Sequence, residues 1–379
     1  MKNFLTFLFY LVPLCYGTLR SQVMPLPEHP RPDFERMEWS NLNGEWKFGF
    51  DSLDIGVKEK WFSDNKNLPL SILVPFPWGS PLSGVPDKGD IGWYQKTITV
   101  NPEWKGKRIF ITVGASDWET SVWLDDHLLG SHQGGYTPFS FELTNYITSG
   151  KAHRITIRVD DKRRLFTLYG KQGYGNARGI WQTVYLEARG EDFIQEFKFH
   201  PDIDLKKVKA EVILSNSSSK ERIVQVTIQT PDGQINEKLL VKPGLNMGMV
   251  DIQLPNPRLW DLEDPYLYTV KLSHEKDEVN TYFGMRKISV TNLPGTNYPY
   301  ISLNNKPVYL QLTLDQSYHP DGYYTFPSDE FMRNEIQMTK DLGLNGIRTH
   351  IKIDIPRKLY WADKLGLFVM SDLPNSWGE

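Results

Sequence analysis

The sequence predicts a multidomain chain with a jelly-roll-like β-sandwich, then an immunoglobulin-like β-sandwich, then the incomplete start of a (β/α)8 TIM barrel. Short strand patterns separated by turn residues run to about Gly190, as in an all-β sandwich. A second series of strand patterns follows, from about Glu191 to Val290. From Ile301 to Glu379, apolar strand patterns alternate with helical ones, which is typical of a parallel α/β structure.

Residues 1–17 have the features of a secretory signal peptide. Lys2 gives the positive charge, and Phe4 to Leu14 form an apolar run that is too short to cross a bilayer. We therefore expect a secreted or periplasmic protein, and no later membrane span is evident. The single cysteine, Cys15, would leave with the signal, so no disulfide is expected. A lipid-anchored Cys15 is the alternative, but Leu14 fits such a site poorly.

Composition and charge narrow the class of function. The formal net charge is -3, and the sequence has no basic patch and no phosphate-binding loop, which argues against a nucleic-acid partner. Aromatic residues make up 13% of the chain, with 12 Trp and 18 Tyr, as expected for β-rich domains and for surfaces that stack on sugars. For any single aromatic residue, a place in a sandwich core is the alternative.

The first domain is expected to span residues 18–190. Its proline-rich start, about Thr18 to Ser40, indicates an arm rather than a packed element. Asn43-Gly44 indicates a turn, Asp125-Asp126 indicates a hairpin turn, and the alternation from Arg154 to Val159 is typical of a strand. These signals together favour a sandwich.

The second domain is expected over residues 191–290. Its number of short strands and its length suit an immunoglobulin-like sandwich. The cysteines and the central Trp of antibody domains are absent, so this prediction depends on the strand count. Thr291 to Tyr300 (TNLPGTNYPY) then has the composition of a linker.

The third domain, residues 291–379, is expected to hold the first three strands of a TIM barrel. Pro307 to Leu314, Gly346 to Ile351 and Leu367 to Met370 are short apolar runs suited to buried parallel strands. Because a complete barrel needs eight strands and roughly 250 residues, this barrel is expected to be truncated.

Two helices are predicted between these strands. Ser328 is the expected N-cap of the first helix, and Phe331, Met338 and Leu342 fall near one face of it, before Gly343. The second helix is expected to begin at Pro356 and to end at Gly366, with an apolar stripe made of Leu359, Ala362 and Leu365.

Polar residues follow the three predicted barrel strands. Asp315, His350 and Asp372 come just after the first, second and third strands, and Arg348 lies within the second. A TIM barrel builds its active site at the carboxyl ends of its strands. These four residues are therefore the candidate substrate-binding residues.

Several longer motifs occur along the chain. The most specific is GASDWETSVWLDDHLLGSHQGGYTPFSFELT (Gly114 to Thr144), a hairpin followed by a Gly-Gly-Tyr segment. The others are GWYQKTITV (Gly92 to Val100), RGIWQTVYLE (Arg178 to Glu187), LPNPRLWDLEDPYLYTV (Leu254 to Val270), YFGMRKISV (Tyr282 to Val290), LNNKPVYLQLTLDQ (Leu303 to Gln316) and LGLNGIRTH (Leu342 to His350). In type and order they resemble the motifs of glycoside hydrolase family 2, which includes β-galactosidases, β-glucuronidases and β-mannosidases.

This resemblance covers nearly all of the chain after the signal. It implies a sugar-binding-type sandwich over residues 18–190 and a retaining glycosidase that acts on β-linked glycans, with no cofactor and no metal. A retaining mechanism needs two carboxyl groups about 5–5.5 Å apart. The resemblance implies that these are glutamates after the fourth and seventh barrel strands. The residues here reach the third, so no catalytic residue is assigned and the isolated chain is expected to be inactive.

The sequence departs from the family pattern at three places. His350 follows Arg348 after one residue, where the family more usually has two. Asp372-Leu373 stands where an Asp-Glu pair is common. GKQGYGNARG (Gly170 to Gly179) has no carboxylate where galactosidases and glucuronidases place an Asp that reaches the sugar. The sugar and its linkage therefore stay open.

Each candidate site residue has an alternative role. Arg348 could brace a catalytic carboxylate or form a structural ion pair at the strand end. His350 could donate to a sugar hydroxyl or be a satisfied histidine at the barrel mouth. Asp372 could bind a hydroxyl or cap the next helix. Asp315, with Gln316, has a weaker claim to contact sugar.

Other polar residues point to structure rather than to chemistry. Asp117 and Trp118 lie in the most specific motif, but packing or a turn is the favoured role. Asp160-Asp161 resembles a metal pair only superficially, because no His, Cys or Asp cluster has metal-ligand spacing. A strand-end turn is favoured there.

Two alternatives to an enzyme made from one chain stay open. One is a non-catalytic carbohydrate-binding protein, supported by the first sandwich and its many Trp and Tyr residues. The other is a split enzyme, in which a second chain completes the barrel. An incomplete parallel sheet leaves an unpaired edge and uncovered apolar faces, and either kind of surface favours a partner.

Overall fold

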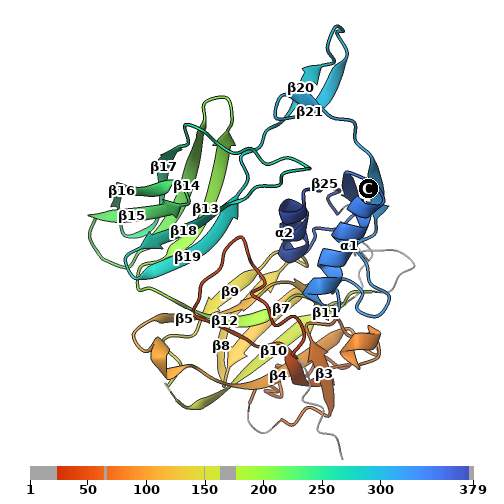
Figure 1. The fold of residues 1–379 in the computed structure, drawn as a ribbon. Helices are drawn as coiled ribbons and strands as arrows, with labels where there is room; N and C mark the ends of the chain where they lie inside the picture. Colours follow the sequence, from red (N-terminus) through yellow and green to blue (C-terminus); the bar gives the residue numbers. More distant parts are fainter. Residues whose placement is uncertain (1–23, 64–65, 149, 163–175, 375–379) are drawn as a thin grey trace, which may run out of the picture.

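The computed structural model describes residues 24–63, 66–148, 150–162 and 176–374. Two β-sandwiches are followed by a short parallel sheet with two helices, which confirms the predicted fold class (Figure 1). The signal-peptide prediction and Cys15 lie outside the described residues. None of the described helices is long and apolar enough to cross a membrane.

In its described part, the first sandwich has twelve short strands in antiparallel pairs. One sheet has the order β1-β12-β5-β9, the second has the order β3-β2-β4-β10-β7-β8, and β11 pairs with β6. The strands are β1 (Trp39–Asn41), β2 (Gly44–Phe50), β3 (Leu70–Val74), β4 (Ile91–Thr99), β5 (Arg108–Val113), β6 (Ser116–Asp117), β7 (Glu119–Leu124), β8 (His127–Gln133), β9 (Phe139–Glu142), β10 (Ala152–Asp160), β11 (Gly179–Ile180) and β12 (Val184–Arg189).

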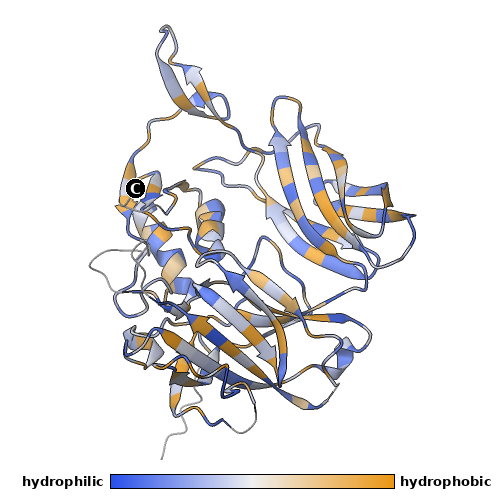
Figure 2. Cartoon of the chain, turned by 180° about the vertical axis from the view of Figure 1, so that it is seen from behind, coloured by the Kyte–Doolittle hydropathy of each residue, from blue (hydrophilic) through white to orange (hydrophobic). Residues whose placement is uncertain are grey.

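Alternation of side chains along these strands creates the core of the first sandwich. Ile155, Ile157 and Val159 of β10 are fully buried in this core. Figure 2 shows hydrophobic and hydrophilic residues alternating along the strands of both sandwiches. The predicted hairpin turn at Asp125-Asp126 is confirmed between β7 and β8, and Asp125 adopts a positive φ of 50°.

The immunoglobulin-like sandwich has seven strands in two sheets. The sheet orders are β13-β14-β17 and β16-β15-β18-β19. The strands are β13 (Ile194–Asp202), β14 (Lys207–Asn216), β15 (Arg222–Thr230), β16 (Gly233–Val241), β17 (Gly244–Gln253), β18 (Tyr268–His274) and β19 (Asp277–Phe283). Valine, isoleucine and leucine from both sheets fill its core, and no disulfide is needed to hold the layers together.

The predicted linker at 291–300 is wrong in part, because its two ends belong to strands. β20 (Ile288–Asn292) pairs with β21 (Pro299–Leu303), which pairs with β22 (Lys306–Pro307). Gly295, with a φ of 76°, lies in the turn, and the Leu293 amide donates to the Tyr298 carbonyl at 2.9 Å. The Pro-Gly signal thus marks a hairpin tip, and the hairpin projects from the body of the molecule (Figure 1).

Three parallel strands follow the hairpin, in the order β23-β24-β25. They are β23 (Leu312–Asp315), β24 (Gly346–Thr349) and β25 (Phe368–Ser371), each shifted from or shorter than its predicted run. The prediction of a fully buried Pro307 to Leu314 strand is wrong, since the run is split between β22 and β23 and Leu314 is 51% exposed.

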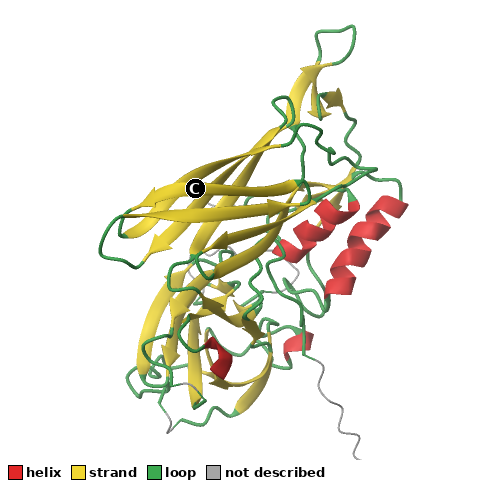
Figure 3. Ribbon diagram, turned by 60° about the vertical axis from the view of Figure 1, so that its left-hand side comes forward, coloured by secondary structure: helices red, strands yellow, loops and turns green. Residues whose placement is uncertain are grey.

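Helix α1 (Asp329–Asp341) and helix α2 (Pro356–Leu365) connect these strands and lie side by side (Figure 3). The predicted N-cap is confirmed, because the Ser328 hydroxyl accepts from the Phe331 amide. Pro356 at the start of α2 and Gly366 at its end are also confirmed.

The predicted apolar face of α1 is wrong in part, since Phe331 packs against the cluster that contains Trp181 but the other two residues do not pack inward. Met338 and Leu342 are exposed, whereas Met332 and Ile336 are buried. Met332 packs in the cluster that contains Trp181 and Phe326, and Ile336 packs against Ile347. The inward face is therefore set by an i, i+4 pair that contacts both the sandwich and the sheet.

The amino-terminal arm is packed, which corrects the prediction of an unpacked segment. Arg36 is 2% exposed and joins the two sandwiches. Its guanidinium donates to Asp277 of β19 at 2.9 and 2.8 Å, to Glu187 of β12 at 2.8 Å, and to the Ile194 carbonyl at 2.6 Å. Two buried carboxylates thus share one buried cation at the domain junction.

Removal of the Arg36 cation should destabilise the chain strongly. We expect Arg36→Met to lower the free energy of unfolding by about 3–5 kcal/mol, because Asp277 would stay buried without a countercharge and Glu187 would keep only Arg189. Urea unfolding followed by tryptophan fluorescence measures this. The control is Arg258→Ala, since Arg258 and Asp264 form an ion pair that is more than half exposed on both sides. If the two variants unfolded at the same urea concentration, Arg36 would not stabilise the junction between the two sandwiches.

Candidate functional site

The carboxyl ends of β23, β24 and β25 meet at one edge of the parallel sheet. Asp315 is the last residue of β23, and His350 and Asp372 directly follow β24 and β25. The His350 amide donates to the Asp315 carbonyl and the Asp372 amide to the Thr349 carbonyl, both at 2.9 Å. The structure therefore brings together the residues that the sequence placed at the strand ends.

Arg348 and Asp372 form a two-point ion pair across neighbouring strands. Arg348 Nε lies 3.2 Å from Asp372 Oδ1, and Nη2 lies 2.7 Å from Oδ2. The side chains are 45% and 24% exposed, so the pair is open to solvent. The geometry matches the ion-pair alternative for Arg348.

His350 and Asp315 have other partners. His350 Nδ1 lies 3.1 Å from the side-chain oxygen of Gln316. Asp315 accepts from Lys358 Nζ at 2.5 Å and from the Ser317 amide at 2.6 Å. Asp315 is thereby fixed to helix α2 and to its own loop, whereas Asp372 is held by Arg348.

Two buried lysines lie beside these strand ends, and the sequence analysis did not identify them. Lys352 is fully buried and donates to the carbonyls of Ser317 at 2.7 Å and Tyr324 at 3.1 Å. Lys358 Nζ lies 3.5 Å from Glu335 and 3.6 Å from Asp354, in addition to its contact with Asp315. The Asp354–Lys358 spacing of four residues at the start of α2 was the available signal.

Electrostatics keep this buried group ionised. Burial opposes ionisation of Asp354, but the cations of Lys358 and Lys352 outweigh it and lower its pKa. Burial likewise opposes the charge on Lys358, yet the carboxylates of Asp354, Asp315 and Glu335 raise its pKa. The network therefore holds the loop after β23 and the start of α2 in one arrangement.

The first sandwich lies directly against this loop. Thr325 Oγ1 donates to the carbonyls of Trp181 at 2.6 Å and Pro75 at 3.0 Å. Lys352 Nζ lies 5.4 Å from the centre of the Trp181 ring, and Trp181 Nε1 donates to the Gly135 carbonyl at 2.7 Å. The sandwich thus fixes a loop at the mouth of the barrel.

Asp117 and Arg178 lie at the same sandwich surface. Asp117 is the end of β6 and lies beside Gly135, where an added Cβ would come within 3.0 Å of its carboxylate. Arg178 Nε donates to Asp161 at 2.8 Å. Burial, with the carboxylates of Asp90 and Asp87, raises the pKa of Asp161 to about 6 despite Arg178. Burial and the neighbouring Asp161 raise the pKa of Asp117 to about 8.

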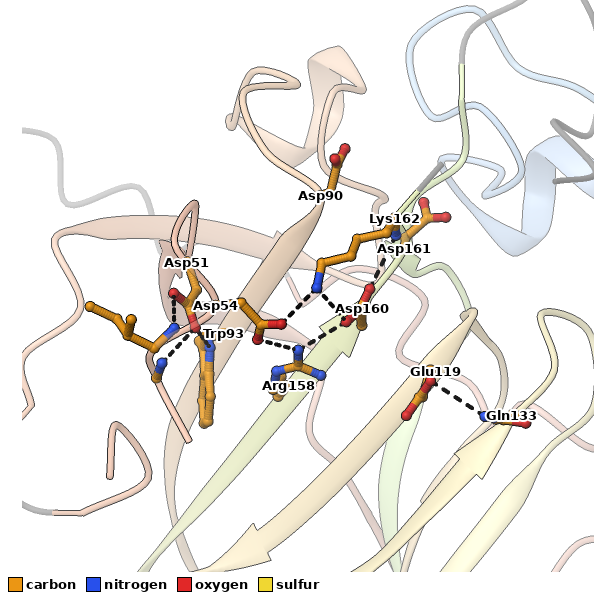
Figure 4. Close-up of polar contacts among 12 residues, drawn as sticks. Asp51, Asp54, Asp90, Trp93, Glu119, Gln133, Arg158, Asp160, Asp161 and Lys162 are labelled. Atoms are coloured by element: carbon orange, nitrogen blue, oxygen red, sulfur yellow. Dashed lines mark hydrogen bonds and ion pairs between the residues drawn. The ribbon is translucent and has the colours of Figure 1, made fainter. Parts of the chain in front are cut away.

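An acidic hollow of about 540 Å³ on the first sandwich is lined by Asp51, Asp54, Asp87, Asp90, Lys162 and Arg178, and ion pairs hold its side chains. Figure 4 shows Arg158 between Asp54 and Asp160, at 2.8 and 2.9 Å, with Lys162 at 2.6 Å from Asp54. Asp51 accepts from the amides of Ile55 and Gly56 and from Trp93 Nε1. Among the described residues, no group of three His, Cys, Asp or Glu side chains could hold a metal ion.

The structure describes only residues 176–179 of the Gly170 to Gly179 motif, which has no carboxylate. In that described part Gly179 pairs with Asp117, because β11 and β6 form a short ladder. The backbone of Gly179 therefore lies beside that of Asp117.

Comparison with known families identifies the two sandwiches. Residues 39–188 match the sugar-binding domain of glycosyl hydrolases family 2, and residues 193–286 match a second domain of the same family. A β-glucuronidase of Bacteroides fragilis is 27% identical over 88% of this chain and 49% of its own length. A β-galactosidase of Thermoanaerobacter pseudethanolicus is 24% identical over 88% of this chain and 45% of its own. The chain thus spans about half the length of these curated relatives.

Solved structures share the fold at lower sequence identity. A β-galacturonidase of Eisenbergiella tayi, bound to galacturonate, has a TM-score of 0.73 and 20% identity over 90% of this chain and 59% of that one. A β-glucuronidase of Ruminococcus gnavus has a TM-score of 0.73 and 19% identity over 92% of this chain and 61% of that one. These structural similarities show that this chain shares the fold of the two solved proteins.

The high pKa of Asp117 should appear in the pH dependence of stability. An unfolded Asp releases its proton near pH 4, whereas folded Asp117 keeps it up to about pH 8. The wild-type chain therefore loses stability relative to Asp117→Asn as the pH rises between these values, by up to about 1.4 kcal/mol for each pH unit.

Urea unfolding at several pH values from 5 to 9 measures this difference, which should stop growing above about pH 8. Asp232→Asn, at an exposed carboxyl in the turn between β15 and β16, is the control and should follow the wild type at every pH. A stability difference between Asp117→Asn and wild type that does not change with pH would show that Asp117 is ionised in the folded chain.

Proposed function

Because this chain belongs to glycoside hydrolase family 2, we propose that it is the amino-terminal part of an enzyme that hydrolyses O-glycosidic bonds of β-linked glycans. The observation that carries the proposal is the match of two consecutive domains to the family, followed after the β20–β22 hairpin by parallel strands with polar carboxyl ends. A TIM barrel uses this edge for catalysis.

The strand-end residues would bind sugar in the complete enzyme. The Arg348–Asp372 pair offers donors and acceptors to vicinal hydroxyl groups, and His350 lies on the same edge. Asp315 would act through its fixed position beside them, because Lys358 holds its carboxylate. The retaining mechanism needs an acid/base and a nucleophilic carboxyl about 5–5.5 Å apart. By family resemblance these are glutamates beyond the third strand.

Uncovered apolar surface supports a continuation of the barrel. Leu314 of β23, Met370 of β25 and Leu373 are 51%, 42% and 75% exposed. β23 and β25 each pair on one side only within the described sheet, and parallel sheets are buried on both faces in stable domains. We propose that further βα units, on this or a second chain, cover these surfaces.

Hydrolysis of nitrophenyl β-glycosides by the complete protein tests the proposed function. We expect release of nitrophenol from at least one of the β-glucuronide, β-galactoside, β-galacturonide and β-mannoside. Residues 1–379 alone should release none. Absence of hydrolysis by the complete protein across the panel, together with glycan binding, would favour the carbohydrate-binding alternative.

Substitution of Arg348 tests the strand-end site. Arg348→Ala in the complete protein should lower kcat/KM by about 10- to 100-fold, because two hydrogen bonds near the sugar are lost. The melting temperature should change little, since the Arg348–Asp372 pair is solvent-exposed. Arg258→Ala, in the second sandwich, is the matched control. If Arg348→Ala left kcat/KM unchanged, Arg348 would not be a substrate-binding residue.

A further inference from the structure

A groove of about 670 Å³ lies between the second sandwich, the amino-terminal arm and helix α2. Its volume is within the range of about 300–1,000 Å³ that is typical of small-molecule sites. Its floor is the outer face of β18 and β19, where Thr269 lies opposite Tyr282 and Lys271 opposite Asn280. This groove is distinct from the strand-end site, because its lining comes from β15, β18, β19, the arm and the outer side of α2.

Two tyrosines form an aromatic corner in the groove. The rings of Tyr282 from β19 and Tyr360 from α2 are 5.3 Å apart and inclined at 63°. Tyr282 Oη donates to Asp363 at 3.3 Å, which fixes the ring between the two domains. Burial raises the pKa of Tyr360, and the carboxylate of Glu35 across the groove adds to this rise. Both rings therefore present apolar faces beside polar groups.

The polar side chains of the groove are available to a ligand. Within the described part of the chain, the structure gives no side-chain hydrogen bond to the five residues Glu35, Gln229, Thr269, Asn280 and Lys364, all of which line the groove. They supply a carboxylate, an ammonium, two amides and a hydroxyl. Such a mixture of donors and acceptors beside aromatic faces matches a hydroxyl-rich ligand.

A peptide that adds a strand would not fit this groove. β19 is the edge of its sheet, but the arm already occupies that edge. The Glu35 amide donates to the Asn280 carbonyl at 2.9 Å, and the Asn280 amide donates to the Glu35 carbonyl at 2.8 Å. Recognition must therefore use side chains, and strand addition needs a free backbone edge.

We propose that this groove is a second, non-catalytic binding site for a β-linked oligosaccharide. Tyr282 and Tyr360 stack on the apolar faces of the sugar rings, and Glu35, Asn280 and Lys364 bind the hydroxyl groups. The choice of a glycan as ligand rests on the proposed function. The site itself does not use the strand-end residues, so glycan bound here leaves the barrel mouth free.

Calorimetric titration of the whole chain with cellotetraose, xylotetraose and a β-galactan tetrasaccharide tests the proposal. We expect at least one to bind with a Kd of about 1 mM or tighter. Thr269→Trp fills the floor of the groove and should weaken binding at least about tenfold. The matched control, Gln225→Trp, adds the same side chain to the same outer face of this sheet, on β15 and outside the groove lining, and should bind as the wild type.

Three outcomes would overturn the proposal. They are no binding of any of the three glycans by the wild-type chain, equal loss in Thr269→Trp and Gln225→Trp, and loss in Arg348→Ala with normal binding in Thr269→Trp. The last result would place the glycan at the strand ends. Circular dichroism confirms that each variant is folded. If the complete protein hydrolyses none of the nitrophenyl β-glycosides but the groove still binds glycan, the enzyme proposal fails and the groove proposal stands.

Discussion

The relative placement of the domains depends on one buried cation, Arg36. Its guanidinium contacts carboxylates from both sandwiches, and Arg189 adds a second cation to Glu187 at 2.7 Å. Asp277 also accepts from the amides of Gly190 and Ile194, where the chain passes from one sandwich to the other. Because a buried carboxylate without a countercharge is costly, these contacts fix the angle between the domains. That angle in turn determines where the second sandwich meets the barrel.

A second charged junction joins the immunoglobulin-like domain to helix α2. Asp363 accepts from Arg286 at 2.6 Å through its carboxylate and from Trp260 Nε1 at 2.7 Å through its carbonyl. The guanidinium of Arg286 lies 4.5 Å from the centre of the Trp260 ring. Helix α2 lines the groove beside Tyr282 and leads directly into β25. The carboxyl end of β25 in turn lies at the strand-end site, so one short α/β segment connects the groove to that site.

Much of the fold was predictable because its signals are local. Alternation in β10, the Asp125-Asp126 turn, the Ser328 cap and Pro356 each depend on a few neighbouring residues. Arg36 could not be interpreted in this way, because its partner Asp277 is 241 residues away. The face of α1 was misjudged since Met338 and Leu342 fit a helical period equally well but point to solvent.

The candidate site was likewise predictable where its signals are local and unpredictable where its contacts join distant parts of the chain. The position of Asp315, His350 and Asp372 at strand ends followed from the strand pattern. The partners of these residues could not be predicted from the strand pattern. In the sequence, Lys352 and Lys358 are indistinguishable from surface lysines, but the fold buries them against carboxylates and aromatic rings. Whether Arg348 braces a carboxylate or pairs with Asp372 likewise depended on the register between β24 and β25.

The packing of the amino-terminal arm also has a consequence for synthesis on the ribosome. The His29 carbonyl accepts from Arg357, which is 328 residues later, and the Glu35 backbone pairs with Asn280. The arm leaves the ribosome first, yet its last partner emerges near the end of these 379 residues. The start of the arm can bind the first sandwich early, since Asn41 and Asn43 donate to the Leu26 and Pro25 carbonyls. The contacts of the arm with Asn280 and Arg357 form only after both later domains have emerged.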